Sequence, residues 1–236
     1  MHRDEEFLLV SLCCSSKINQ PGVEMLKSNG YSINSFPSKT LTEERYAAVI
    51  EHIKEMYLWF APDSTEEGMR KRIYQHPEAY IDLLMHDESG ECRGFSIYYA
   101  EQFEGFQVMF RGGTIVKDRS HGLYKALLHH SIDQSKLDFV VAMTQNPRVY
   151  ETLRSFSPTG IAYPSTNGVF SETIKRITHK FCKVPDINPE TMIVSGIYKT
   201  IRKENDFRGA RDPEVMEFFA KNLAENDGFF VVVPLS

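Results

Sequence analysis

The clearest chemical signal in this sequence is a short basic turn, Lys117-Asp118-Arg119-Ser120-His121-Gly122. It follows a β-like segment that ends at Val116 and precedes residues with helical spacing. The first backbone N–H groups of a helix have no partner inside it, and the helix dipole adds partial positive charge at that end. Gly122 would allow close approach to the backbone, while Lys117, Arg119 and Lys125 could supply charge. The turn therefore predicts a site for a phosphate-bearing ligand.

Two neighbouring features point to a ligand beside this turn. Gly112-Gly113 lies inside the expected strand Phe106 to Val116, where glycine often marks a bulge or the close approach of a ligand. A simple bend in an edge strand is the alternative. The apolar run Phe139 to Met143 suits a strand buried on both faces, and Asn146 after it can cap a helix that begins at Pro147. We expect the glycine pair to splay the two strands apart and open a slot.

In this order of segments the chain resembles the GNAT superfamily of acyl-CoA-dependent N-acyltransferases. The similarity spans roughly Tyr31 to Phe156 and is sharpest in the segments just described. In that family the pyrophosphate lies on a Gln/Arg-x-x-Gly-x-Gly/Ala turn. The pantetheine arm runs beside a bulged fourth strand, and an Asn after the fifth strand faces the same arm. Arg119 and Gly122 occupy the first two motif positions here, and Tyr124 stands at the third.

The resemblance implies direct transfer of an acetyl group from acetyl-CoA to an amine, without a covalent enzyme intermediate. Many family members place a Tyr on the helix after the Asn, where it protonates the CoA thiolate. Leu153 holds that position here, and Tyr150, one turn earlier, is the nearest substitute for the catalytic acid. Glu104 is the expected proton relay from the ammonium of the acceptor. The residues expected to bind acetyl-CoA are Thr114, Ile115, Val116, Arg119, Ser120, His121, Gly122, Leu123, Tyr124 and Asn146.

Purely structural roles for the same residues are the alternative interpretation. Tyr124 and Tyr150 could simply pack, and Glu104 could lie in a solvated loop. The whole chain could also be a non-catalytic GNAT-like module that binds CoA or a protein partner, or a plain α/β binding domain without a CoA site. The acceptor, a small-molecule or peptide amine, has no motif of its own.

The expected fold is α/β (α+β), with a mixed, mostly antiparallel central sheet flanked by helices. A Thr40-x-x-Glu43 capping box is expected to open the first helix, which Pro62 stops. The apolar face of that helix runs from Tyr46 to Phe60. Further helices are expected at 65–75, 123–135, 147–156, 170–182 and 213–223, and strands at 31–38, 80–86, 92–100, 106–116, 139–143, 192–200 and 228–235. The last strand is strongly apolar, so we expect it to be paired inside the same sheet.

Three parts are expected along the chain. Residues 1–30 form an N-terminal arm or strand, 31–157 form the GNAT-like acyl-CoA-binding core, and 158–236 complete the sheet. This last part exceeds what a minimal domain needs, and it could cover the acceptor site or build a homodimer.

Composition sets the expected environment of the chain. The 236 residues carry a formal net charge of −5, which disfavours non-specific binding to nucleic acid or anionic lipid. The apolar run Phe7 to Cys14 is too short to span a bilayer. The four cysteines show no CxxC spacing and are interpreted as free thiols in a reducing cytosol. These thiols predict a cytoplasmic protein. His129 and His130 point about 100° apart on a helix, so we expect no metal site.

Overall fold

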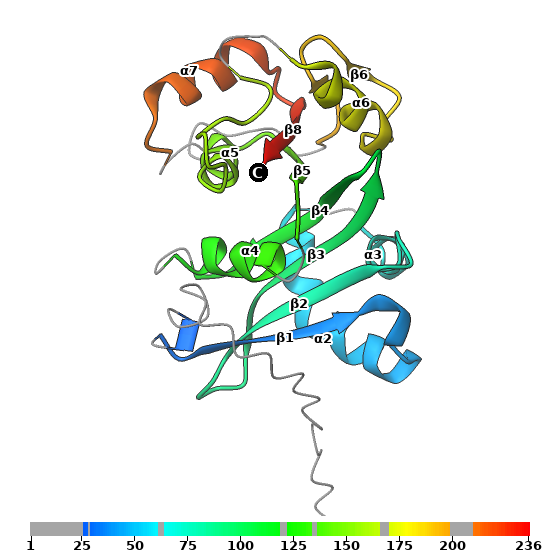
Figure 1. Cartoon of the computed structure of the whole chain (residues 1–236). Helices are drawn as coiled ribbons and strands as arrows, with labels where there is room; N and C mark the ends of the chain where they lie inside the picture. Colours follow the sequence, from blue (N-terminus) through cyan, green and yellow to red (C-terminus); the bar gives the residue numbers. More distant parts are fainter. Residues whose placement is uncertain are drawn as a thin grey trace, which may run out of the picture.

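The computed structural model describes residues 26–27, 29–60, 64–118, 122–133, 136–165, 170–198 and 210–236. They form one eight-stranded sheet in the order β1-β2-β3-β4-β5-β8-β7-β6 (Figure 1). Every neighbouring pair is antiparallel except β4 and β5, which are parallel. The mixed, mostly antiparallel sheet expected from the sequence is therefore confirmed. Its strands are β1 (Tyr31–Pro37), β2 (Ala79–His86), β3 (Cys92–Phe103), β4 (Phe106–Val116), β5 (Phe139–Thr144), β6 (Ile187–Asn188), β7 (Ile193–Val194) and β8 (Gly228–Pro234).

Helices cover both faces of the sheet, because successive side chains of a strand point to opposite faces. On β3, Ile97 packs in a cluster with the helices α2 and α3, whereas Tyr98 packs with Leu128 of α4 on the other face. The faces are covered by α2, α3 and α6 on one side and by α4, α5 and α7 on the other (Figure 1). The helices are α2 (Glu43–Phe60), α3 (Glu66–Ile73), α4 (Leu123–Asp133), α5 (Pro147–Arg154), α6 (Glu172–Phe181) and α7 (Pro213–Asn222).

The C-terminal strand lies inside the sheet. β8 pairs with β5 along its length, from Phe139 opposite Pro234 to Thr144 opposite Phe229. It is buried on both faces: Phe229 packs with α7 and Phe230 with α6. Burial on both faces explains its continuous apolar run.

Two expected boundaries were wrong for local reasons. Thr42, not Thr40, begins the first helix: its Oγ1 accepts from the Arg45 N–H at 3.3 Å, while Thr40 closes a 3-10 turn and its hydroxyl donates to Pro37 O at 2.8 Å. Of the expected strand 192–200, residues 199 and 200 lie outside the described residues, and only Ile193–Val194 of the rest forms a strand. Positive φ angles at Met192 (57°) and Gly196 (62°) turn the chain at both ends.

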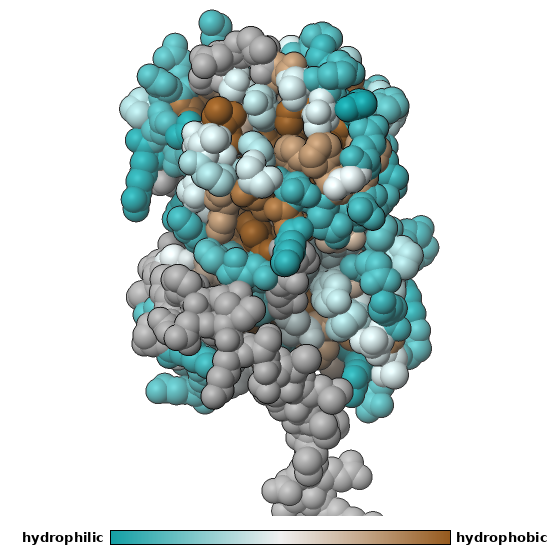
Figure 2. Space-filling model, in the orientation of Figure 1, coloured by the Kyte–Doolittle hydropathy of each residue, from teal (hydrophilic) through white to brown (hydrophobic). Residues whose placement is uncertain are grey.

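A hollow on one face exposes apolar side chains (Figure 2). The cavity there, about 350 Å³, is lined by residues from α4, from the segments around β5 and α5, and from the chain end, among them Ile132, Leu137, Phe156 and Leu235. No helix among the described residues is long and apolar enough to cross a bilayer. The same residues contain no His, Cys, Asp or Glu cluster that could hold a metal ion.

Candidate functional site

A β-bulge interrupts β4 at the glycine pair. Ile97 of β3 lies opposite Gly113 and Tyr98 lies opposite Arg111, so Gly112 has no partner in β3. A Cβ on Gly112 would lie 2.6 Å from Nε2 of Gln75 and 3.3 Å from the carbonyl oxygen of Ile97. A side chain here would displace the end of Gln75 from its place at the bulge, and the expected bulge is confirmed.

β4 and β5 part immediately after the bulge begins. Their parallel ladder runs from Val108 opposite Phe139 to Arg111 opposite Ala142 and stops there. β4 continues to Val116 paired with β3, while β5 continues to Thr144 paired with β8. Within the described part of the chain, the edge of β4 that faces β5 thus has no strand partner beyond Arg111. The slot expected between the two strands is present.

A cavity of about 800 Å³ occupies this opening. Its walls are β4 from Arg111 to Ile115, the end of β5 with Gln145 and Asn146, the α3 region, and Ile197 with Tyr198 from the C-terminal part. The volume is within the range of small-molecule sites, roughly 300–1,000 Å³. We refer to this cavity as the cleft.

Two buried amide atoms in the cleft have no hydrogen-bond partner among the residues that the structure describes. They are Nε2 of Gln75, which lies at the bulge, and Oε1 of Gln145, which follows β5. Buried polar atoms are nearly always paired in folded proteins. One donor and one acceptor are therefore ready for a ligand that carries amide or hydroxyl groups.

Arg111 is a buried cation with neutral partners. It is 7% exposed, and its Nε donates to Oγ1 of Thr114 at 2.8 Å. One Nη donates to the hydroxyl of Tyr124. Among the described residues no carboxylate forms an ion pair with it. Since a buried charge is costly unless paired, the cleft favours an anionic or strongly polarised ligand group.

Tyr198 reaches the cleft from the C-terminal part of the chain. Its ring packs directly on Gly228 at the start of β8, where a Cβ would lie 2.6 Å from Cε2 of the ring. Burial raises the pKa of Tyr198 to about 12, while Arg111 and Arg72 oppose this rise. The hydroxyl is therefore protonated at neutral pH and lies close to two guanidinium groups. It can donate a proton or a hydrogen bond to a leaving group in the cleft.

Three of the residues expected to bind acetyl-CoA line the cleft: Thr114, Ile115 and Asn146. Thr114 accepts from Arg111 and its hydroxyl lies 2.8 Å from that of Ser96. Asn146 caps α5 as expected, accepting from the Arg148 N–H at 2.9 Å. The sequence correctly brought the bulge and this cap to one place.

The other expected contacts are distributed differently. Val116 and Leu123 pack in the cluster beneath α4, and Tyr124 holds Arg111. Gly122 has φ 68° and its carbonyl accepts from the Ala126 N–H at 3.0 Å, so it opens α4. Arg119, Ser120 and His121 lie outside the described residues. The charge expected from Lys117 is directed elsewhere, because its Nζ pairs with Glu55 at 3.0 Å.

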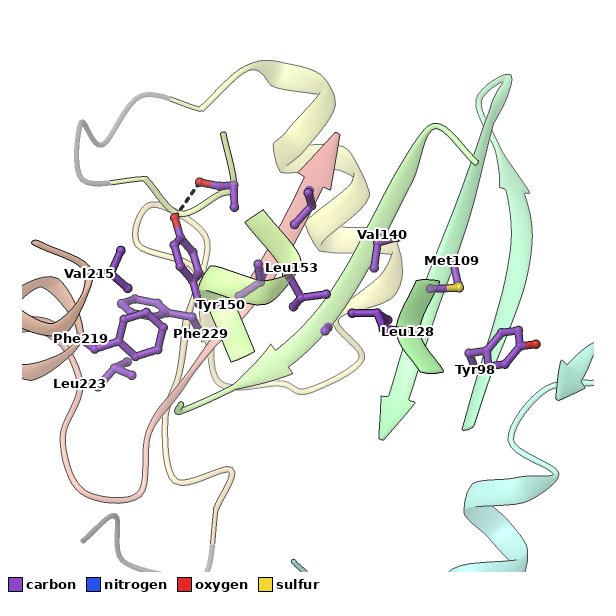
Figure 3. Close-up of a cluster of buried hydrophobic side chains, with 14 residues drawn as sticks. Tyr98, Met109, Leu128, Val140, Tyr150, Leu153, Val215, Phe219, Leu223 and Phe229 are labelled. Atoms are coloured by element: carbon purple, nitrogen blue, oxygen red, sulfur yellow. Dashed lines mark hydrogen bonds between the residues drawn. The ribbon is translucent and has the colours of Figure 1, made fainter. Parts of the chain in front are cut away.

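The two expected catalytic residues lie away from the cleft. Tyr150 is 3% exposed, and its hydroxyl donates to the carbonyl oxygens of Ala162 and Pro164 at 2.9 and 2.8 Å. Figure 3 shows it inside the hydrophobic cluster with Phe219 and Leu153. Glu104 forms the β3–β4 turn, at the opposite end of β4, and pairs with Arg176 at 3.2 Å. The structure brings neither of them to the bulge.

Sequence reasoning missed several residues that the cleft contains. Arg111 could have been noticed as a lone charge between an apolar run and the glycine pair. Gln75 and Arg72 carried no signal beyond the helical spacing of their segment. Tyr198 fell in an expected strand, and no local pattern places it beside β4.

The sequence matches no protein-family model and no curated protein. Solved structures similar to the chain include an aminoglycoside acetyltransferase from an uncultured soil metagenomic sample, 15% identical, with a TM-score of 0.42, covering 56% of this chain and 90% of the other. A ribosomal-protein-S5-alanine acetyltransferase from Vibrio fischeri is 14% identical, with a TM-score of 0.41 and coverages of 53% and 78%. A GNAT family acetyltransferase from Staphylococcus aureus is 20% identical, with a TM-score of 0.35 and coverages of 44% and 78%. Similarity this low carries no substrate with it.

Proposed function

We propose that the chain is an acyltransferase that binds acetyl-CoA in the cleft and transfers the acetyl group to an amine. The observation that carries the proposal is the parting of β4 and β5 at the Gly112 bulge. An unpaired strand edge offers backbone N–H and C=O groups to an extended ligand, in the manner of an added strand. The pantetheine arm is such a ligand, because it is linear and contains two amide groups.

The buried amides of the cleft support the same ligand. Nε2 of Gln75 and Oε1 of Gln145 lack partners, and a pantetheine amide supplies both an acceptor and a donor. The N-terminus of α4, opened by Gly122, is the proposed contact for the pyrophosphate, since free N–H groups and the helix dipole favour anions there.

Acetyl-CoA supplies the reactive thioester. The residues of the chain hold the two reactants and donate a proton to the leaving group. A neutral amine nitrogen attacks the thioester carbonyl, a C–N bond forms and the C–S bond breaks. The amine proton passes to solvent, and the departing sulfur takes a proton from the hydroxyl of Tyr198, which solvent then restores. Alignment of the two reactants contributes up to roughly 7–11 kcal/mol to lowering the barrier.

Two measurements on the full chain test the proposal. Acetyl-CoA at about a hundred times its Kd should raise the free energy of unfolding by ~2.7 kcal/mol, measured by denaturant unfolding. Release of free CoA thiol in the presence of an amine panel should then exceed the rate without protein. Absence of stabilisation would contradict the donor site.

A non-catalytic CoA-binding module is the second candidate. It is favoured by the position of Leu153, which is 1% exposed in the core where the family's tyrosine is expected. Stabilisation by acetyl-CoA without thiol release for any amine would support the module and contradict the enzyme.

A further inference from the structure

The charged side chains that are described in the lining of the cleft are all positive. Among the described residues, its lining contains three cationic side chains, Lys71 and Arg72 at the end of α3 and Arg111 on β4, and no Asp or Glu. The chain as a whole has a net charge of −5, so this local excess opposes the overall balance. Low-dielectric walls strengthen the field of such a group of charges.

Two arginines of the cleft have no carboxylate partner in the part of the chain that the structure describes. Arg72 and Arg111 form no ion pair with any carboxylate that the structure describes. Lys71 differs, since its Nζ pairs with Glu67 at 2.9 Å. Within the described residues, the charge without an ion-pair partner therefore belongs to Arg72 and Arg111, which line the cleft together with Tyr198.

Arg72 is separated from the proposed phosphate contact by the sheet, whereas Arg111 reaches Tyr124 of α4. α3 packs with α2 on one face, through Met69 and Ile73. α4 lies on the opposite face, where Leu123 and Leu127 pack on Leu84 (Figure 1). Phosphates held at the N-terminus of α4 would thus leave Arg72 free. An anion on the α3 side must come from the second substrate.

We infer that the acceptor is a small amine that also carries a carboxylate, and that Arg72 binds this carboxylate. The inference rests on the proposed function and specifies its substrate class. A guanidinium matches a carboxylate with two parallel hydrogen bonds. The two arginines in the lining would repel polyamines and other polycationic acceptors. A volume of about 800 Å³, shared with the end of the donor, restricts the acceptor to a small molecule.

The test compares α-amino acids with their own carboxamides, which keep the amine and lose only the negative charge. With acetyl-CoA and the full chain, thiol release should show kcat/KM at least tenfold higher for the acid than for the amide of the preferred side chain. Spermidine should be a poorer acceptor than either. Equal rates for acid and amide, or preference for spermidine, would overturn the inference while leaving the acyltransferase intact.

Variants assign the effect to Arg72. Arg72→Gln should reduce the acid-to-amide ratio towards one by raising KM for the acid, whereas Arg72→Lys should retain part of it. The Kd of acetyl-CoA should be unchanged in both, because the donor phosphates are proposed on the other face. A matched control is Arg176→Gln, an exposed arginine that pairs with Glu104 outside the cleft and should change nothing. A weaker acetyl-CoA affinity with an unchanged ratio in Arg72→Gln would contradict the assignment.

Direct binding covers the case in which no acceptor turns over. Calorimetry on the full chain saturated with CoA should detect the acid and not the amide, and Arg72→Gln should abolish the difference. Equal binding of acid and amide overturns the inference. Failure of acetyl-CoA itself to bind overturns the proposed function, so the two failures are distinguishable.

Discussion

At the scale of the residue, chemistry in the cleft is set by what each side chain has for neighbours. Tyr150 is buried and Tyr198 is half-buried, and desolvation raises the pKa of each to about 12. The hydroxyl of Tyr150 donates to two backbone carbonyl oxygens. Tyr198 faces the cleft beside Arg72 and Arg111. The same residue type is structural in one place and proposed as an acid in the other.

Tyr198→Phe should lower kcat by roughly tenfold to a thousandfold, since general acid help acts only in the transition state. The Kd of acetyl-CoA should stay nearly constant. Steady-state kinetics with the preferred acceptor, together with calorimetry, check both parts.

The pH profile sharpens this prediction. A pKa raised to about 12 keeps the hydroxyl of Tyr198 protonated below that pH. We therefore expect no fall in kcat from loss of this acid between roughly pH 8 and 10, where an ordinary tyrosine begins to ionise. A fall in that window that disappears in Tyr198→Phe would be inconsistent with the buried donor.

Tyr150→Phe separates the structural role from the catalytic one. Loss of the hydroxyl leaves the carbonyls of Ala162 and Pro164 without their donor, which should cost about 1–3 kcal/mol of unfolding free energy. Turnover per folded molecule should stay unchanged. If turnover falls while stability is retained, Tyr150 is the acid after all, as the sequence suggested.

At the scale of the element, the cleft exists because one strand changes partners. β4 is bonded on both sides up to Arg111 and on one side afterwards, while β5 is carried away on β8. The bulge at Gly112 increases the local twist at the point where the strands separate. A rigid sheet thus provides an open edge without an exposed apolar strand.

Gly112→Ala should weaken acetyl-CoA binding at least tenfold. The new Cβ would lie 2.6 Å from Nε2 of Gln75, so the Gln75 amide must move from its place in the cleft. Thermal shift and calorimetry with acetyl-CoA measure the change.

Gly90→Ala is the matched control for backbone strain. Gly90 has φ 65° with nothing near its would-be Cβ, so alanine there should cost about 1 kcal/mol of stability and leave acetyl-CoA affinity intact. An equal loss of affinity in both variants would show that destabilisation alone explains the result.

A buried carboxyl group at the contact of β1, β2 and α4 makes the stability of the protein depend on pH. Asp82 is fully buried and accepts from Ser35, Ser131 and Tyr98 at 2.7, 2.9 and 3.3 Å. Burial raises its pKa, and nearby His130 and these hydroxyls only partly oppose the rise. A raised carboxyl pKa contributes stability below the ordinary value, and that contribution is lost as pH rises through the value in the folded state.

We therefore compare the free energies of unfolding of the wild type and of Asp82→Asn. The difference, wild type minus variant, should decrease as pH rises from about 4 to 8. Each unit of pKa difference corresponds to ~1.4 kcal/mol. Urea unfolding in a His130→Gln background excludes titration of the histidine. A difference that is flat with pH would rule out the raised pKa.

At the scale of the whole molecule, residues after Ser157 are part of the sheet and of the cleft. β8 inserts between β5 and β7, and Arg154 of α5 binds Asp212 before α7 at 2.6 Å. The same part supplies Tyr198. Elements before and after residue 157 therefore pack together in one sheet.

A chain that ends at Ser157 should not fold cooperatively. β5 would lose its partner β8, and the core would lose Phe229 to Val233, all 1% exposed or less. Near-UV circular dichroism and denaturant unfolding should show no sharp transition, and addition of residues 158–236 as a separate chain should restore one. A soluble, cooperative fragment that binds acetyl-CoA would refute this dependence.

The sequence by itself determined the elements and the place of the opening. Period-two and helical spacing are local properties, so most strands and helices follow from short stretches of sequence. The glycine pair marks the bulge because glycine often occurs where a strand is interrupted. The helix cap at Asn146 is equally local. These signals place the cleft between β4 and β5.

Only the tertiary structure decided which side chains meet in that opening. Arg72, Arg111 and Tyr198 come from a helix end, a strand and the C-terminal part, and no spacing rule connects them. Tyr150 illustrates the converse: its place one turn after Asn146 suggested a groove, but packing against Phe219 and bonds to Ala162 and Pro164 turn it into the core. Helical phase gives the direction of a side chain, whereas burial and charge depend on segments that fold onto it from far along the chain.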